Sequence, residues 1–204
     1  GKGLIFMGCY VAEGGHGLQW LHEDGTKVGG QHWVGGTWTG APTLAVDNGK
    51  NAIADHLCYV GSVWEGELRI TAKTRDLGDK PVFKMKLGDD PKLKESDPKN
   101  PPVLEGFDGG QHKFVLGGIA VHDGEIICCM TRQNEILAFN TKANALEKRI
   151  RVSDPRGVTY DSEGRLLILS GNKLLRLDAY DAKPQALIAT GIEDPRHVFE
   201  KNGR

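Results

Sequence analysis

Two short motifs that carry ionisable side chains recur along the chain. Gly-Gly-Gln-His occurs at 29–32 and at 109–112, and Asp-Pro-Arg occurs at 154–156 and at 194–196. Imidazole and guanidinium groups bind carboxylates, phosphates and acidic sugars through charge-assisted hydrogen bonds. If the repeated segments meet in space, they form an anion-binding rim on one face of the fold. The candidate binding residues are His32, His112, Arg156, Arg196 and His197.

The same motifs have a structural interpretation, which we favour. Glycine-rich and Asp-Pro-Arg segments are typical of the turns between repeated units. Asp and Arg side chains at such turns can form ion pairs that tie one unit to the next. On this interpretation Arg156 and Arg196 stabilise the fold instead of binding a ligand.

Two tryptophans lie in a glycine-rich segment and are candidates for partner binding. Trp33 and Trp38 fall in Gly-Gly-Gln-His-Trp-Val-Gly-Gly-Thr-Trp, where small neighbours leave the aromatic faces accessible. Accessible indole rings stack on sugars or on a partner's side chains. Packing between repeats is the alternative for this pair. For Trp20 and Trp64, which lie in predicted strands, packing is the favoured interpretation.

Metal ligation is a further chemistry open to histidines. His32, His112 and His197 are of a residue type that binds zinc and other transition metals. They come from different repeats, and lone histidines in strands more often make surface contacts or hydrogen bonds. We therefore predict no metal site and no cofactor, with a calcium or zinc ion as the alternative. Gly-x-Ser-x-Gly, His-Glu-x-x-His and P-loop motifs are absent from the sequence.

The four cysteines give no zinc-finger spacing. Cys128 and Cys129 are adjacent, and neighbouring residues in a strand point to opposite faces. We interpret the cysteines as small buried apolar residues. A disulfide between Cys9 and Cys58 remains open.

Composition excludes several classes of protein. The net charge is −1 and the basic residues are scattered, so the chain has no electrostatic footprint for nucleic acid. No window approaches the roughly 18 apolar residues of a membrane-spanning helix. The 28 glycines among 204 residues, without collagen periodicity, indicate many tight turns between short strands.

An internal repeat of about 40 residues is the strongest pattern in the chain. Ile119, Val158 and Val198 are 39 and then 40 residues apart, and each lies in an apolar segment followed by a glycine-containing turn. Turns within one period separate four short strands, predicted at 117–122, 125–131, 135–140 and 146–152. The next period repeats them at 156–160, 165–170, 173–178 and 185–190. Four antiparallel strands in about 40 residues describe one blade of a β-propeller.

The prediction of blades made of short strands extends to the N-terminal half. We predict an all-β fold, a β-propeller of four-stranded antiparallel blades that forms a partial ring of about 3.5 blades. Because the chain begins inside a blade, we expect further chain or a second copy to complete the ring. The predicted units are a partial blade at 1–40, a blade at 41–88, an inserted loop and lead-in at 89–116, blades at 117–155 and 156–195, and the first strand of another blade at 196–204.

The segment 154–178 resembles an NHL repeat. It runs from Asp-Pro-Arg-Gly-Val through an apolar strand, an acidic residue and glycine, to a second apolar strand and a Gly-Asn turn. The likeness is good across 117–204 and weaker across 1–88. It implies a propeller that binds partners, in a large extracytoplasmic bacterial protein, and it implies no single reaction.

The favoured prediction is a non-catalytic platform for a protein or glycan partner. The alternative is a lactonase-like hydrolase or lyase whose central metal site is completed by other blades. Lactonase-like propellers hold calcium at the channel centre with carboxylates and asparagines. Here the comparable residues fall in turns after the first strands, on the opposite face, where they act as turn formers; they are Asp47, Asn48, Asp123 and Asp161.

Overall fold

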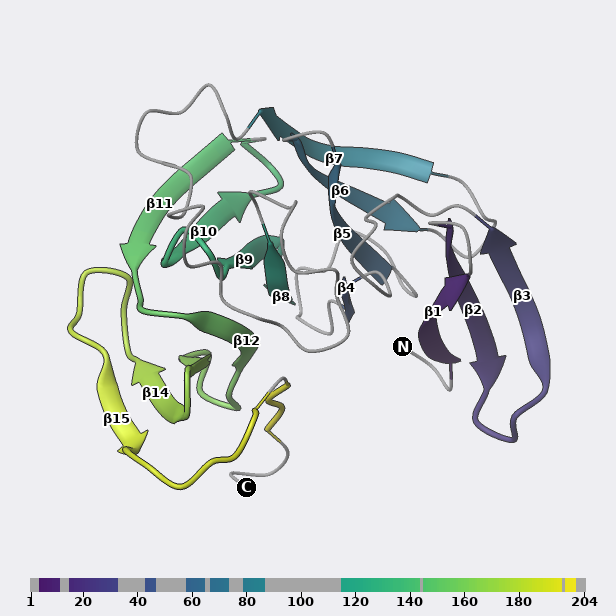
Figure 1. Cartoon of the computed structure of the whole chain (residues 1–204). Coiled ribbons are helices and arrows are strands. Elements are labelled where there is room, and N and C mark those ends of the chain that lie inside the picture. The colour runs from purple at the N-terminus through teal and green to yellow at the C-terminus, as the bar shows by residue number, and fades with distance from the viewer. Residues whose placement is uncertain are drawn as a thin grey trace.

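The computed structural model of the chain describes residues 4–11, 15–32, 43–46, 58–64, 67–73, 79–86, 115–143, 145–195 and 197–200. Every regular element in these ranges is a β-strand. The strands form antiparallel sheets that fan around a common centre (Figure 1). The predicted all-β class and propeller-like fold are confirmed.

The sheets follow one another along the chain. The first contains β1 (Leu4–Val11), β2 (Gly15–His22) and β3 (Lys27–His32). The second contains β4 (Thr43–Val46), β5 (Cys58–Trp64), β6 (Glu67–Lys73) and β7 (Asp79–Lys86). The third contains β8 (Leu116–His122), β9 (Glu125–Met130), β10 (Glu135–Asn140) and β11 (Ala145–Arg151). The fourth contains β12 (Pro155–Tyr160), β13 (Leu166–Ser170), β14 (Lys173–Leu177) and β15 (Gln185–Ile188).

The strands expected in the C-terminal half match the structure to within two residues at every end. Asp123 and Gly124 form the two-residue turn between β8 and β9, both with positive φ. Asp161 accepts hydrogen bonds from the backbone N–H groups of Glu163 and Arg165, at 2.9 Å each, in the turn between β12 and β13. The prediction that Asp123 and Asp161 are turn formers is thus confirmed.

The glycine-rich segment 29–32 differs from its prediction. The sequence placed it in a connection between blades, whereas the structure continues β3 as far as His32. Its residues pair with β2 from Gly17 to Trp20, and a register shift follows at Leu21. Glycine weakens a strand but does not prevent antiparallel pairing, so the ladder is long enough to include both glycines.

The innermost strands β4, β8 and β12 lie side by side. β8 packs against both β4 and β12. A Cβ atom on Gly118 would lie 3.1 Å from the Cα atom of Gly157. Glycine at 118 therefore allows β8 and β12 to approach each other closely, backbone to backbone, near the centre, where a side chain would force the two strands slightly apart.

Two apolar clusters join neighbouring sheets. One joins the second and third sheets and includes Leu68, Ile119 and Cys128. The other joins the third and fourth sheets and includes Ile127, Cys129 and Ile168. β9 is buried on both faces because it contributes alternate residues to both clusters. The predicted opposite orientation of the adjacent cysteines is confirmed.

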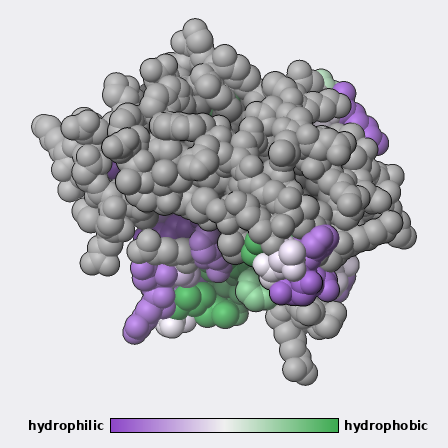
Figure 2. Space-filling model, turned by 90° about the vertical axis from the view of Figure 1, so that its right-hand side faces the viewer, coloured by the Kyte–Doolittle hydropathy of each residue, from purple (hydrophilic) through white to green (hydrophobic). Residues whose placement is uncertain are grey.

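The fourth sheet also exposes apolar surface. Leu187 and Ile188 of β15 and Phe199 of the following segment are exposed, Phe199 to 81%. Hydrophobic surface gathers at the lower end of the molecule, between hydrophilic groups (Figure 2). The third sheet buries comparable side chains against its neighbours.

Candidate functional site

Arg156 joins the two Asp-Pro-Arg motifs. Its Nε and Nη2 atoms each lie 3.0 Å from Oδ2 of Asp154, and its Nη1 lies 3.4 Å from Oδ1 of Asp194. Both aspartates have positive φ, which Asp tolerates better than most residues. The guanidinium therefore links the turn that enters β12 to the equivalent turn of the next repeat. This geometry agrees with the interpretation of Asp-Pro-Arg as a tie between repeats.

Further hydrogen bonds hold the same turn. Asp154 donates its backbone N–H to Oδ1 of Asn134 at 2.7 Å. The Thr131 hydroxyl donates to the carbonyl of Pro155 at 2.8 Å, and the Ser170 hydroxyl donates to the carbonyl of Ser153 at 2.5 Å. Thr131 and Asn134 belong to the turn between β9 and β10 of the third sheet, so the two bonds that they make cross between sheets.

The other predicted rim residues are only partly described. His197 is exposed, just after the second Asp-Pro-Arg motif. His32 ends β3, and its side chain lies outside the described part of the structure. Trp33, Trp38, His112 and Arg196 lie outside the described residues. A binding role for this set stays a prediction.

A cavity of about 370 Å³ lies between the inner strands. Its walls come from the C-terminal halves of β4, β8 and β12 and from Val198 and Glu200. The surface that the lining exposes is more polar than apolar, although most of the lining residues have apolar side chains. Apolar lining residues are Leu44, Ala45, Val46, Ile119, Ala120, Val121, Val158 and Val198, and polar ones are His122, Thr159, Tyr160, Asp161 and Glu200.

A network of aromatic and acidic side chains supports the polar residues of the lining. The His122 and Tyr160 rings lie 5.2 Å apart at 37°. The Tyr160 hydroxyl lies 3.2 Å from Oε2 of Glu125 and 3.3 Å from the Tyr180 hydroxyl. Burial, the Tyr180 hydroxyl and the Glu125 carboxylate all raise the pKa of Tyr160. Tyr160 therefore stays protonated and links the third and fourth sheets.

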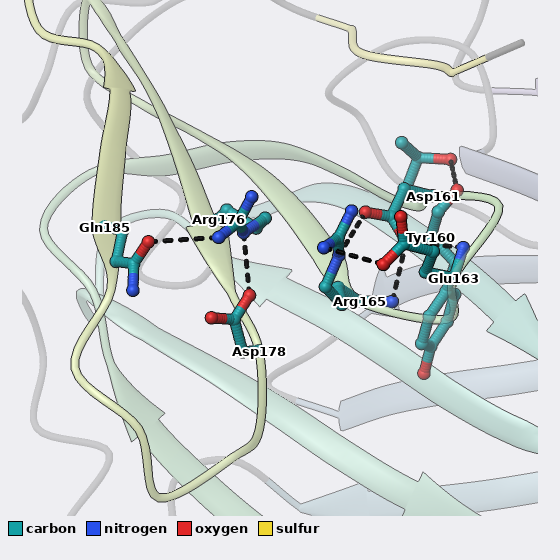
Figure 3. A network of polar contacts seen from close by, with 8 residues as sticks. Tyr160, Asp161, Glu163, Arg165, Arg176, Asp178 and Gln185 are labelled. Carbon is teal, nitrogen blue, oxygen red and sulfur yellow. Dashed lines mark hydrogen bonds and ion pairs between the residues drawn. The ribbon is translucent and has the colours of Figure 1, made fainter. Parts of the chain in front are cut away.

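Asp161 is tied into its own turn (Figure 3). Its Oδ2 accepts a hydrogen bond from Nε of Arg165 at 2.7 Å, and its side chain is 7% exposed. Burial raises the pKa of Asp161, but the hydrogen bonds from Arg165 and Glu163 together lower it by more, so the net effect is a lowered pKa. The carboxylate is therefore ionised and paired. Figure 3 also shows Arg176, which pairs with Asp178 at 2.7 Å within the fourth sheet.

Cys128 and Cys129 are poor nucleophiles; the side chains of Cys9 in β1 and Cys58 in β5 lie outside the described part of the structure, so their disulfide stays a prediction. Cys128 and Cys129 are free thiols with no exposed surface. Burial raises the pKa of both thiols, which keeps them protonated. Within the described ranges, no group of three His, Cys, Asp or Glu residues is placed to hold a metal ion. No helix in that part of the chain is long and apolar enough to span a membrane.

The cavity residues differ from those expected from sequence. Arg156 and His197, the two predicted residues described with their side chains, do not line it. The alignment of the repeats could have identified Tyr160 and Glu200 as cavity residues. With the 39- and 40-residue spacings, both take the position of Val121, so polar side chains replace an apolar one.

No protein-family model matches the chain, and no curated protein is a significant match. Solved structures do match. TolB from Acinetobacter baumannii aligns at 14% identity with a TM-score of 0.58, over 94% of this chain and 43% of that one. A putative 6-phosphogluconolactonase from Bacteroides fragilis aligns at 14% identity with a TM-score of 0.57, over 93% and 55%. A nidogen/laminin complex aligns at 13% identity with a TM-score of 0.53, over 90% and 60%.

These likenesses show the fold alone. The chain spans about half the length of the structures that it matches. It is an all-β protein with a propeller-like arrangement of sheets.

Proposed function

We propose that the chain is part of a β-propeller that serves as a non-catalytic platform for a protein or glycan partner. The likeness of the segment 154–178 to an NHL repeat is the basis for proposing that it belongs to an extracytoplasmic bacterial protein. The observation that carries the proposal is the cavity formed where four successive segments converge around the centre. Concave sites of this kind are the usual place for ligand binding.

The contacts of the ionisable groups support binding over catalysis. Asp161 is paired with Arg165, and Arg156 is held between two carboxylates. The Tyr160 hydroxyl contacts Glu125 and Tyr180. A general acid or base must exchange a proton with its substrate, so groups engaged in such structural contacts are poorly suited to the task.

The second candidate is a hydrolase or lyase with a central metal ion. It is favoured by the position of the cavity between the inner strands and by the likeness to a putative 6-phosphogluconolactonase. Calcium or zinc would bind here together with ligands from other blades.

One pair of measurements separates the two candidates. The full chain is probed on a glycan array and, separately, assayed against a panel of lactones with and without added Ca²⁺ or Zn²⁺. The platform proposal expects saturable glycan or protein binding, with lactone hydrolysis at the uncatalysed rate. Metal-dependent turnover with one bound ion per chain would replace it with the enzyme.

A further inference from the structure

β15 forms the outer edge of the fourth sheet (Figure 1). It pairs antiparallel with β14 on one side, and within the described part of the chain no strand pairs with its other side. All four of its residues are exposed, including the apolar side chains of Leu187 and Ile188, at 46% and 43%. The backbone N–H and C=O groups along such an edge are available to a further strand.

The last strand of each of the other three sheets, in chain order, differs from β15 in composition. Lysine, other charges and proline at an edge disfavour the addition of a strand. β15 has the sequence Gln-Ala-Leu-Ile, without a charge or a proline. All four last strands contain a register shift, so this feature does not distinguish them. The residues that oppose pairing are Lys27 in β3, Lys80, Pro81, Lys84 and Lys86 in β7, and Lys148, Arg149 and Arg151 in β11.

The residues paired with β15 indicate which kind of strand fits its edge. The ladder partners of Ile188 and Ala186 on β14 are both leucines, so the C-terminal part of β15 is apolar. At the other end, the Gln185 amide oxygen accepts a hydrogen bond from Nη2 of Arg176 at 3.1 Å, and Arg176 also pairs with Asp178. The charged ladder partner of β15 is therefore already paired. The edge offers main-chain hydrogen bonds and apolar contacts, which suit an uncharged strand with apolar side chains.

We propose that β15 binds an extended peptide segment of a partner protein, which adds a fifth strand to the fourth sheet. In this mode of recognition the main chain supplies the hydrogen bonds, and side chains at alternate positions supply the specificity. An edge of four residues accommodates such a peptide but is too small for a stable dimer of this chain, which needs roughly 800 Å² from each partner. The inference rests on the proposed platform function, and it places a peptide partner outside the cavity.

The test measures the binding of defined peptides to the full chain by fluorescence anisotropy. The probes are short labelled peptides that alternate threonine with isoleucine or valine. Each is also made in two N-methylated forms, with the methyl groups on the odd-numbered or on the even-numbered amides. Alternate residues of a strand direct their N–H groups to opposite edges, so one form should bind like the parent peptide and the other should not bind.

Two substitutions in β15 locate the site. Leu187→Lys and Ile188→Lys introduce the kind of charge that the other last strands carry. Both side chains are exposed, so the fold should be retained, which circular dichroism and thermal unfolding check. Each change is expected to weaken peptide binding about fivefold, the upper end of the range for one lost cross-strand contact. Phe199→Lys is the matched control, because it replaces an exposed apolar residue outside β15 and should leave binding unchanged.

The outcomes separate this inference from the proposed function. Binding that is lost in one N-methylated form and weakened by both β15 variants supports strand addition at this edge. If no peptide binds, if the two N-methylated forms behave alike, or if Phe199→Lys weakens binding as much as the β15 variants do, the assignment is wrong. A chain that dimerises in sedimentation, and that Leu187→Lys makes monomeric, would have a second copy at this edge in place of a peptide. Protein or glycan binding that survives both β15 variants keeps the platform function and removes only this site.

Discussion

Arg156 and Asp194 are 38 residues apart in sequence, yet Nη1 of Arg156 lies 3.4 Å from Oδ1 of Asp194. Each belongs to an Asp-Pro-Arg motif, so the contact joins equivalent points of two successive repeats. The guanidinium also holds Asp154 at 3.0 Å. One side chain thus orients two turns with positive φ, and the geometry of each repeat depends on its neighbour.

Removing this link should weaken the fold measurably. Arg156→Ala is expected to lower the free energy of unfolding by about 1 kcal/mol, since it breaks two partly exposed ion pairs. Chemical denaturation at low and high salt measures the change, which should shrink at high salt. Arg176→Ala is the matched control, because Arg176 is equally exposed, at 26%, and pairs with Asp178 in its own sheet. Equal losses in the two variants would refute a special role for the link between repeats.

Arg156 also tests the anion-rim prediction. If the rim binds a carboxylate or phosphate, Arg156→Ala should reduce that affinity while stability stays nearly unchanged. If the ion pairs tie the repeats together, stability falls and anion affinity stays the same.

A second prediction follows from the close approach of the third and fourth sheets at Gly117. A Cβ atom on Gly117 would clash with the Thr131 hydroxyl and would lie 2.8 Å from the Arg156 carbonyl oxygen and 3.1 Å from that of Pro155. Because the two carbonyl oxygens belong to the backbone, Gly117→Ala should destabilise the fold by about 2–3 kcal/mol, in the range of overpacking. Gly164→Ala is the control. The φ of Gly164 is +77°, but a Cβ atom there would meet no atom within 4 Å beyond its chain neighbours. That variant should lose about 1 kcal/mol through backbone strain alone. Thermal and chemical unfolding compare the two, and a smaller loss at Gly117 would contradict the packing.

Much of the C-terminal half could be predicted from sequence, because two independent signals, the repeat spacing and the turn residues, indicate where its strands lie. The 39- and 40-residue spacings of Ile119, Val158 and Val198 set the period, and turn residues such as Asp123 and Asp161 mark the strand ends. Both signals are local, so no knowledge of the neighbouring sheets was needed. The glycines of β3 show the converse, since their composition indicates a turn while pairing with β2 makes them a strand.

The cavity could not be predicted in the same way. It depends on how closely β4, β8 and β12 approach one another, and that distance depends on contacts such as Gly118 with Gly157. The Tyr160–Glu125 contact joins residues 35 positions apart on different sheets. A repeat pattern identifies equivalent positions but not the side chains that meet between repeats.

The lowered pKa of Asp161 predicts that the free energy of unfolding depends on pH in the acid range. Its folded pKa is lowered, so its contribution is present above the unfolded pKa of about 3.9 and is lost as pH falls through the folded pKa. Asp161→Asn should lower stability by about 1–2 kcal/mol at pH 7, through lost charge-assisted hydrogen bonds. The difference from the unmodified chain should shrink below about pH 4.

The control for Asp161 is Asp24→Asn. Asp24 accepts a hydrogen bond from the Thr26 backbone N–H at 2.8 Å in a comparable turn, and that bond lowers its pKa, but the residue is exposed. Its substitution should change stability less. Urea denaturation from pH 3 to pH 7 gives both profiles, and a pH-independent difference at Asp161 would rule out its ionised carboxylate as the cause.

The raised pKa of Tyr160 predicts that stability falls as pH rises in the alkaline range. Burial, together with Tyr180 and Glu125, raises its folded pKa above the unfolded value of about 10. Its contribution to stability is therefore complete below about pH 10 and is lost as pH rises further, because the unfolded state releases the proton first. Tyr160→Phe should lose about 1 kcal/mol at pH 8, from the hydroxyl contacts. It should also flatten the decline of stability between about pH 10 and pH 12.

Three other groups must be separated from this effect, because burial and Glu125 also raise the pKa of Tyr180. Burial also raises the thiol pKa values of Cys128 and Cys129, so stability should begin to fall above about pH 8.5 for a different reason. Comparing Tyr160→Phe with the unmodified chain at each pH cancels the cysteine contribution, since both chains retain the thiols. Phenolate absorbance provides an independent measurement, because Tyr160 should ionise only on unfolding. Ionisation of Tyr160 near pH 10 in the folded chain would show that its hydroxyl is open to solvent, and the contact between the third and fourth sheets would then be wrong.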